Sequence, residues 1–500
     1  MSEEPQIRLY GNWHPTAQAA GMGRLTLGQT MGLLIGAAVA MILAQTAGLA
    51  WAAGELALLG LVLGVAMAKD KHGLNVMDRA KERRMFSKAR RRKATVYRGG
   101  VLAPSKRSDG SCRLPGVAGG TTLSEHEDAH RRPFVVIHHP DGRLTVPMAL
   151  APAGIALVDQ DMVDRQVALW GMWLADLAGM TGVTDASVTV ETAPDTGVRL
   201  RREVTSHASD QAPQVARQII EAVVDREGGS GASVTVTATV SFQPSQMSTE
   251  RRGRTKRAIR DIATRLPGLT QSLAATGAGS VHLLTAAEIT RMARVAYDPA
   301  VEAVLDDMAL EGVHMPLDWS QAGPVGAQAN WDSYAHDSGL SRSWTMTSPP
   351  RAAVQSNVLA PLLSVSNDVE RKRVTILYRP LPASRSPEVV ERDVDKAANA
   401  VRMSKRPTER RLRSLEAARQ TSREEADGAA LVDFGVIVTA TVTGGGDAAR
   451  RLADAGAAVE SRAAAARLLS RPAYGAQDTA FSLALPLGIS PARGTLTGGW

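Results

Sequence analysis

Two long apolar runs lie near the start of the chain, and a short linker of turn-compatible residues separates them. The residues from Met31 to Ala44 are all apolar, and the run from Ala52 to Ala68 is interrupted only by Glu55. A helix needs about 20 mainly apolar residues to cross a membrane, with a tolerance down to about 17. The pattern therefore predicts a two-helix transmembrane hairpin over residues 25–68.

Glycine recurs every four residues in both runs, at Gly28, Gly32 and Gly36 and again at Gly60 and Gly64. Small residues at this spacing lie on one face of a helix and let two helices approach closely in a membrane. We expect these glycines to be helix-packing residues. The alternative is that glycine is simply common in membrane helices.

The positive charge of the chain is concentrated directly after the apolar runs. The net charge is +8, and residues 69–98 contain twelve Lys or Arg against three acidic residues. Basic residues within about 15–20 residues of a membrane helix are retained in the cytoplasm. The sequence therefore predicts a multi-pass protein of the cell (inner) membrane with cytoplasmic N- and C-termini, the N-terminal segment being residues 1–24.

The basic block is expected to form a juxtamembrane helix over residues 69–98 that contacts the lipid bilayer. Its membrane-surface residues would be Lys81, Arg83, Arg84, Arg90, Arg91, Arg92 and Lys93. Nucleic-acid binding is an alternative, but few aromatic residues interleave with these cations, so direct contact with nucleic acid is not expected. A signal peptide cleaved near Ala50–Ala52 is another alternative, disfavoured because the apolar region begins far from the N-terminus and a second run follows.

Beyond a Gly-rich linker over residues 99–120, short β-branched runs alternate with helical patterns, and Pro140–Gly142 predicts a hairpin turn. We expect strands over 132–139, 143–150, 187–192, 233–242, 280–284, 340–346, 373–378 and 431–443. We expect helices over 161–177, 212–225, 249–265, 351–363, 388–402, 408–426 and 448–469. The predicted fold class is α+β: the transmembrane hairpin plus two cytoplasmic ferredoxin-like α/β sandwich units, residues 121–330 and 331–500.

Few motifs in the chain indicate chemistry. His126, Glu127 and His130 satisfy H-E-x-x-H, which on a helix would place two zinc ligands on one face. Pro133 follows closely and the segment offers no apolar face, so a solvated loop is the preferred interpretation. The single Cys112 has no partner for a disulfide, and no phosphate-binding G-x-x-x-x-G-K-[ST] occurs. We therefore expect no catalytic residue, no metal and no cofactor.

Several strings are similar to a family of two-pass membrane proteins encoded on actinobacterial conjugative elements, beside type IV secretion genes. They are Arg8–Trp13, Leu123–His126, Val190–Gly197, Arg265–Leu269, Val295–Pro299 and Arg371–Pro380. The similarity covers almost the whole chain. It implies a secretion-associated protein.

A further string resembles the end of the N-terminal domain of the large conjugative secretion ATPase, just before its motor domain. Gln477, Phe481, Pro486 and Gly488 carry this family motif. The resemblance implies an ATPase-like docking domain without the motor.

These observations favour a non-enzymatic inner-membrane structural component of a conjugation or type IV secretion apparatus that docks a separate ATPase at the membrane. The expected partners are that ATPase and other secretion-machine subunits, with the chain as an oligomer within the complex. One alternative is the two-span core subunit of a type VII secretion system. An alternative of another class is a membrane-tethered zinc hydrolase using His126, Glu127 and His130.

Overall fold

The computed structural model describes residues 11, 27–46, 48–67, 75–103, 110–154, 158–207, 209, 211–227, 231–313, 317–350, 353–404 and 406–490. Its helices are α1 (Leu27–Thr46), α2 (Leu49–Met67), α3 (Val76–Arg91), α4 (Gln160–Gly179), α5 (Val198–His207), α6 (Gln214–Glu227), α7 (Pro244–Met247), α8 (Arg254–Leu273), α9 (Ala286–Tyr297), α10 (Glu302–Leu310), α11 (Ala360–Leu363), α12 (Ser386–Arg402), α13 (Glu409–Ala426), α14 (Ala448–Ala465) and α15 (Gln477–Leu483). Its strands are β1 (Val96–Arg98), β2 (Thr122–Glu127), β3 (Pro133–His138), β4 (Leu144–Ala151), β5 (Val183–Pro194), β6 (Ala232–Phe242), β7 (Ser280–Leu283), β8 (Gly326–Ala329), β9 (Tyr334–His336), β10 (Gly339–Ser348), β11 (Arg371–Pro380), β12 (Val432–Thr443) and β13 (Leu469–Pro472).

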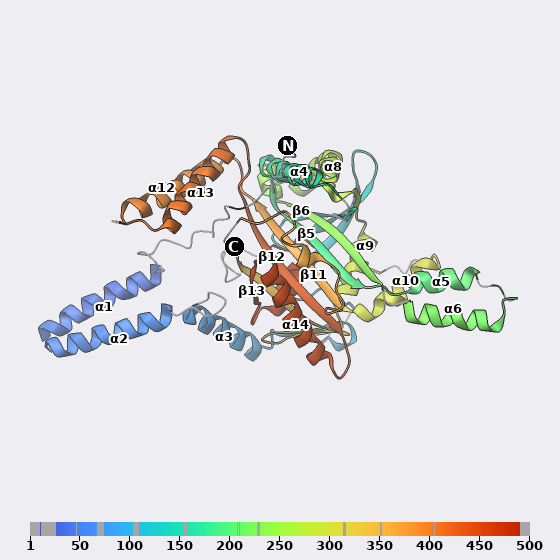
Figure 1. Cartoon of the computed structure of the whole chain (residues 1–500), viewed down its shortest axis with the longest axis horizontal. Helices are drawn as coiled ribbons and strands as arrows, with labels where there is room; N and C mark the ends of the chain where they lie inside the picture. Colours follow the sequence, from blue (N-terminus) through green and yellow to red (C-terminus); the bar gives the residue numbers. More distant parts are fainter. Residues whose placement is uncertain are drawn as a thin grey trace, which may run out of the picture.

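The predictions of a transmembrane hairpin and of a multi-pass membrane location are wrong. Helices α1 and α2 form and lie side by side, away from the sheet (Figure 1). Among the residues that the structure describes, however, no helix combines the length and the apolar character needed to cross a membrane. Gln29 and Gln45 lie near the two ends of α1, and Glu55 interrupts α2. The unbroken apolar stretch of each helix is therefore shorter than the about 20 residues of a membrane helix.

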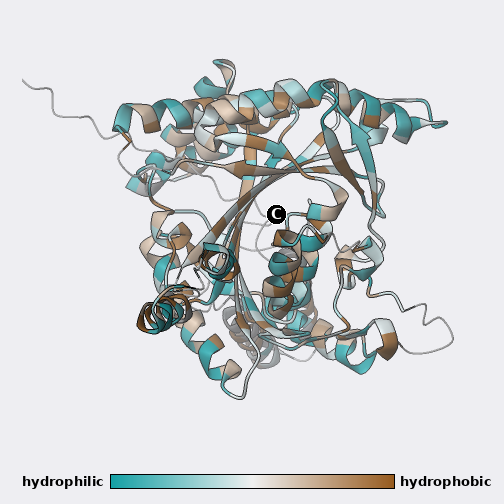
Figure 2. Cartoon of the chain, turned by 90° about the vertical axis from the view of Figure 1, so that its right-hand side faces the viewer, coloured by the Kyte–Doolittle hydropathy of each residue, from teal (hydrophilic) through white to brown (hydrophobic). Residues whose placement is uncertain are grey.

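The predicted fold class is also wrong, because the strands do not form two separate sandwich units. In the described part of the chain, thirteen strands form one antiparallel sheet in the order β1-β8-β9-β10-β12-β11-β5-β6-β4-β3-β2, with β13 beside β10 and β7 beside β4. The sheet is twisted and curved, with helices packed around it (Figure 2). The pairing of β5 with β11 joins strands from both predicted units into this single sheet.

The sheet nevertheless contains one strand arrangement twice. In the first half, β4 pairs with β3 at its start, with β7 at its end and with β6 along its length, and β6 pairs with β5. In the second half, β10 pairs in the same way with β9, β13 and β12, and β12 pairs with β11. The two halves meet at β5 and β11, which are antiparallel neighbours. A rotation of 180° about an axis perpendicular to the sheet therefore relates the strand order of one half to that of the other.

The register confirms this relation residue by residue. One cross-strand row runs through His282, Ala149, Thr237 and Thr189 in the first half. It continues through Thr375, Ile437, Thr345 and Arg471 in the second half. Thr189 and Thr375 are direct partners in this row. The two-fold axis therefore passes between these two threonines.

Residues directly opposite each other in neighbouring strands point to the same side of the sheet, so each cross-strand row lies on one face. Apolar clusters pack against both faces. We call the side to which Thr189 and Thr375 point the inner face. The outer face packs under α4 and α8 in the first half, through residues such as Trp173 and Ile262. In the second half it packs under α14, through residues such as Val459.

Candidate docking surfaces

Pairs of buried hydroxyl groups cross the inner face of the sheet. Thr145 pairs with Ser241 at 2.7 Å, Ser187 with Thr239 at 2.7 Å, Thr189 with Thr375 at 3.0 Å, Ser343 with Thr439 at 2.8 Å and Ser341 with Thr441 at 2.7 Å. A hydroxyl both donates and accepts, so these pairs satisfy one another away from water. Each pair uses the proton of one hydroxyl, so the other hydroxyl still needs an acceptor. The segment that covers this face must supply such acceptors, because a buried polar group without a partner is costly.

The C-terminal string over residues 477–488 provides that cover. The Gln477 side chain accepts the backbone N–H of Ser343 at 2.8 Å and donates to the Ser343 carbonyl at 3.2 Å. The hydroxyl of Thr375 donates to the carbonyl of Ala484 at 2.9 Å. The four family-motif residues, Gln477, Phe481, Pro486 and Gly488, are all buried.

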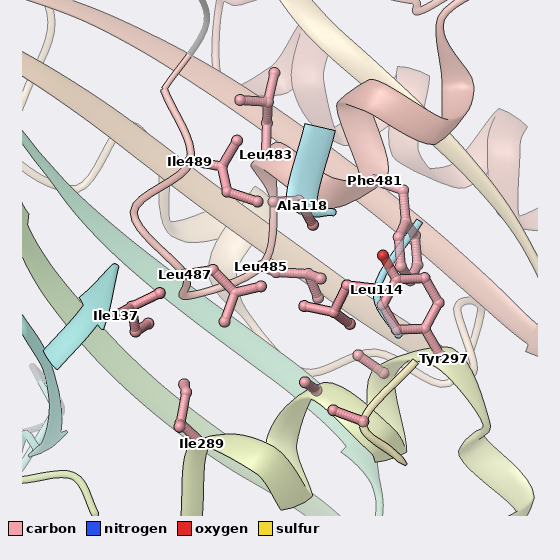
Figure 3. Packing of buried hydrophobic residues seen from close by; sticks show 14 of the residues in the cluster. Leu114, Ala118, Ile137, Ile289, Tyr297, Phe481, Leu483, Leu485, Leu487 and Ile489 are labelled. Atoms are coloured by element: carbon pink, nitrogen blue, oxygen red, sulfur yellow. The ribbon is translucent and has the colours of Figure 1, made fainter. Parts of the chain in front are cut away.

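Phe481 anchors the string in an apolar cluster on the inner face. Its ring lies 5.1 Å from that of Tyr297 and 5.3 Å from that of Tyr334, centroid to centroid, and the Arg373 guanidinium lies 5.7 Å from its centroid. Figure 3 shows Phe481 and Tyr297 together with the leucines and isoleucine that follow Phe481 along the string. The motif therefore forms part of the core and offers no exposed surface to a partner.

Two helical hairpins project from the body in opposite directions, and each connects the central strands of one half (Figure 1). The α5–α6 hairpin lies between β5 and β6, and the α12–α13 hairpin lies between β11 and β12. They therefore occupy equivalent positions in the two halves.

The α6 helix exposes an apolar stripe. Val215, Ile219 and Val223 follow one another at four-residue spacing, and their exposed fractions are 66%, 59% and 51%. Residues four apart lie on the same side of a helix, so these side chains form one continuous strip. The helix α13 at the equivalent position is strongly charged, and its Leu412 is the large apolar side chain that it exposes most, at 39%. We call Val215, Ile219 and Val223 the α6 stripe.

A groove of about 660 Å³ opens on the outer face of the second half, and we call it the outer groove. One wall is α4, where Met172 is 63% exposed, and the other is formed by Pro350, Val358 and Leu359. Its floor comes from β11 and β12, and residues 427–430 close one end. The lining is apolar apart from Asp427 and the hydroxyl-bearing Tyr378.

The predicted basic residues lie on or directly after α3, outside the sheet. Lys81, Arg83, Arg84, Arg90, Arg91, Arg92 and Lys93 are all exposed. The opposite side of α3 binds the body. The Glu82 carboxylate accepts a hydrogen bond from each terminal nitrogen of Arg471, at 3.0 and 2.6 Å. The centroid of the Phe86 ring lies 5.4 Å from that of the Trp331 ring. The α3 helix is thus fixed with its cations facing outward.

The H-E-x-x-H residues lie on a strand and a turn. His126 and Glu127 are consecutive residues of β2, so they point to opposite faces, and His130 lies in the turn that follows. The Ser124 hydroxyl contacts the Nε2 atoms of His126, at 2.8 Å, and His138, at 2.6 Å. Burial lowers the pKa of both imidazoles. Within the described ranges, no three His, Cys, Asp or Glu residues gather closely enough to hold a metal ion.

The predicted helix-packing glycines lie in α1 and α2. A Cβ on Gly36 would lie 2.5 Å from Leu59 Cδ2, so Gly36 lies where the two helices meet. Gly32, Gly60 and Gly64 have open space around them, and the surroundings of Gly28 lie outside the described residues.

Comparison with protein-family models and with curated proteins finds no match for this chain. Sequence reasoning had missed both the α6 stripe and the outer groove. The predicted helix over 212–225 already held the stripe, because Val215, Ile219 and Val223 recur at helical spacing. No local signal indicates the groove, because its lining comes from separate parts of the chain.

Proposed function

We propose that this chain is a non-enzymatic assembly subunit of a conjugation or type IV secretion apparatus, and that it binds the separate ATPase of that apparatus through the α6 stripe. The exposed row of Val215, Ile219 and Val223 is the observation that carries the proposal. An apolar strip on a projecting helix is a typical docking surface, since a partner that covers it gains about 1.5–3 kcal/mol for each fully buried side chain.

The identity of the partner rests on the resemblance of the C-terminal string to the conjugative secretion ATPase. Gln477 and Phe481 hold that string on the inner face, so it acts as a structural element of this chain. The resemblance implies a docking domain like the one that precedes the motor, and a domain of that kind is suited to assemble beside the ATPase. The string supports the proposal through this resemblance, and the stripe provides the contact.

A pull-down with the ATPase from the same genetic element tests the proposal. The variant Ile219→Asp/Val223→Asp places two charges in the stripe without touching the sheet, so the fold should persist. We expect wild-type chain to retain the ATPase and the variant to retain at least ten-fold less, because truncating or charging central interface residues costs about 2 kcal/mol or more.

Leu412→Asp is the matched control, since Leu412 lies on the equivalent hairpin of the second half. It should retain the ATPase as wild type does. Equal retention by all three proteins would exclude the stripe as the docking surface, and failure of wild type to bind would exclude the ATPase as the partner.

A further inference from the structure

The outer groove exists because the two halves differ in one connection. In the first half, residues 152–182 contain the 20-residue helix α4, which packs Trp173 onto the outer face. In the second half, the described part of the equivalent residues 349–370 forms an α-helix only over the four residues of α11. The sheet beside α11 therefore lies below a groove, with Ile376 on its floor.

One described residue near the start of the chain lies beside the segment that forms a wall of this groove. Gly11, which the structure describes, lies against Ala353: a Cβ on Gly11 would be 3.1 Å from both Cα and Cβ of Ala353. Ala353 lies between Pro350 and Val358, which both line the groove. The missing side chain of glycine allows this close approach of the two backbones. Gly11 therefore lies beside the segment that carries Pro350 and Val358 of the groove lining.

The residues around Gly11 have the chemistry that the groove accepts. Leu9 and Tyr10 precede Gly11, and Trp13 follows. The aromatic side chains combine a large apolar surface with a polar edge, which suits a groove that is apolar apart from a few polar groups. A volume of about 660 Å³ lies within the usual range of pockets that bind a few large groups. Arg8 also precedes Gly11, and its charge is opposite to that of Asp427 in the lining.

The connection to α1 permits this placement. Residues 12–26 lie between Gly11 and the start of α1, and a chain of that length extends up to about 50 Å. The helix pair α1–α2 lies on the side of the molecule from which α12 and α13 project (Figure 1). A segment held at the groove can therefore continue into α1 without rearrangement of the body.

We propose that the outer groove binds the chain's own N-terminal segment, with Leu9, Tyr10 and Trp13 as its apolar anchors and Gly11 at its wall. The segment takes the place that a helix equivalent to α4 would fill in the second half. This contact fastens the beginning of the chain to the body. It is independent of the proposed ATPase contact, because the α6 stripe lies on the other half.

Cysteine crosslinking of the full chain tests the proposal, since Cys112 is the single native cysteine. In a Cys112→Ala background, Tyr10→Cys is combined with Met172→Cys, and the matched control combines Tyr10→Cys with Met403→Cys, whose side chain is 89% exposed on the α12–α13 hairpin. A disulfide forms readily only when the two Cβ atoms come within about 3.5–4.5 Å. We expect the first pair to form an intrachain disulfide at least ten-fold faster than the control pair.

Limited proteolysis supplies a second readout that does not depend on disulfide geometry. Met172→Glu charges the exposed wall of the groove and should expose the N-terminal segment, so that trypsin cleaves after Arg8 at least ten-fold faster than in wild type. Met403→Glu should leave that rate unchanged. Equal crosslinking of both pairs, together with equal cleavage of all three proteins, would overturn the proposal. A Tyr10→Cys to Met172→Cys crosslink found only between two copies would also overturn it, because a second copy would then occupy the groove.

Discussion

The hydroxyl groups of Thr189 and Thr375 lie 3.0 Å apart at the centre of the sheet, although 186 positions separate them in sequence. They are equivalent residues of the two halves, and the axis that relates the halves passes between them. Thr375 also donates to the carbonyl of Ala484 in the C-terminal string. Because that bond uses the Thr375 proton, Thr189 must donate within the pair. One hydroxyl pair thus joins the two halves and their cover.

Replacing Thr375 by valine tests this linkage. Valine keeps the shape of threonine but removes the donor to Ala484 and the acceptor for Thr189, so two buried polar groups lose a partner. The free energy of unfolding should fall by about 1–3 kcal/mol, measured by urea denaturation. Thr189→Val/Thr375→Val should cost less than the sum of the single variants, because the second substitution removes a group that is already unpaired. Strict additivity would contradict the proposed coupling.

Gly488, the last residue of the C-terminal string, is expected to be sensitive to substitution. Its φ is +65°, and an added Cβ would lie 2.3 Å from Thr145 Cγ2. Gly253 has a similar φ of +69° with open space around it, so Gly253→Ala isolates the backbone cost of about 1–2 kcal/mol. Gly488→Ala should destabilise the chain by at least about 1 kcal/mol more in thermal or urea unfolding, because the methyl group overpacks the site. Equal losses would show that the string moves freely away from β4.

Local patterns predicted the elements that depend on local interactions. Pro140–Gly142 forms the turn between β3 and β4, where Gly142 has a φ of +84° and the N–H of His139 donates to the carbonyl of Arg143. The apolar periodicity over 161–177 corresponds to α4. Turn residues and helical spacing act within a few positions, which is why a single sequence reveals them.

The predictions that were wrong concern features that depend on distant parts of the chain. A helix was predicted over 351–363, but of its described residues only Ala360–Leu363 are helical. Alternating Thr and Ser in β6, as at Thr239 and Ser241, resembles a solvated face, yet both are buried under a string more than 200 positions later. The pairing of β5 with β11 is equally non-local, so two separate units were predicted in place of one sheet.

The ion pair between Glu82 and Arg471 should decide whether α3 stays on the body. Both side chains are largely buried, and the guanidinium donates two hydrogen bonds to the carboxylate. Glu82→Gln leaves a buried cation without its counter-charge, a change that costs about 3–5 kcal/mol when the pair is fully buried. We expect faster amide hydrogen exchange throughout α3 in this variant.

Exchange in the central strands β5, β6, β11 and β12, which do not pair with the Arg471 strand β13, supplies the internal reference for that experiment. It should stay slow, because the hydroxyl pairs and the C-terminal string do not involve α3. Asp78→Asn changes the other acidic residue of α3 and serves as the control, with exchange close to wild type. Unchanged exchange of α3 in Glu82→Gln would show that the helix stays on the body without the ion pair, through contacts such as that of Phe86 with Trp331.

His336 should make the stability of the chain depend on pH below neutrality. Its Nδ1–H donates to the carbonyl of Tyr297 at 2.6 Å, and its Nε2 accepts from the Ser341 hydroxyl at 2.7 Å, so the buried ring is neutral. Burial lowers its pKa from about 6.5 to about 4. Between these values the unfolded chain binds a proton that the folded chain excludes, so this contribution is complete above pH 6.5 and is lost as the pH falls towards 4.

The expected loss from His336 is on the order of 3 kcal/mol over this interval, since each pKa unit corresponds to about 1.4 kcal/mol. His336→Gln retains one donor and one acceptor but does not titrate, so its unfolding free energy should decline less steeply between pH 7 and pH 4.5. His139, whose pKa burial also lowers to about 4, keeps part of the slope in that variant. His130→Gln, a change in an exposed turn, is the control and should follow the wild-type profile. Parallel profiles for wild type and His336→Gln in urea titrations would mean that the folded chain accommodates the protonated ring.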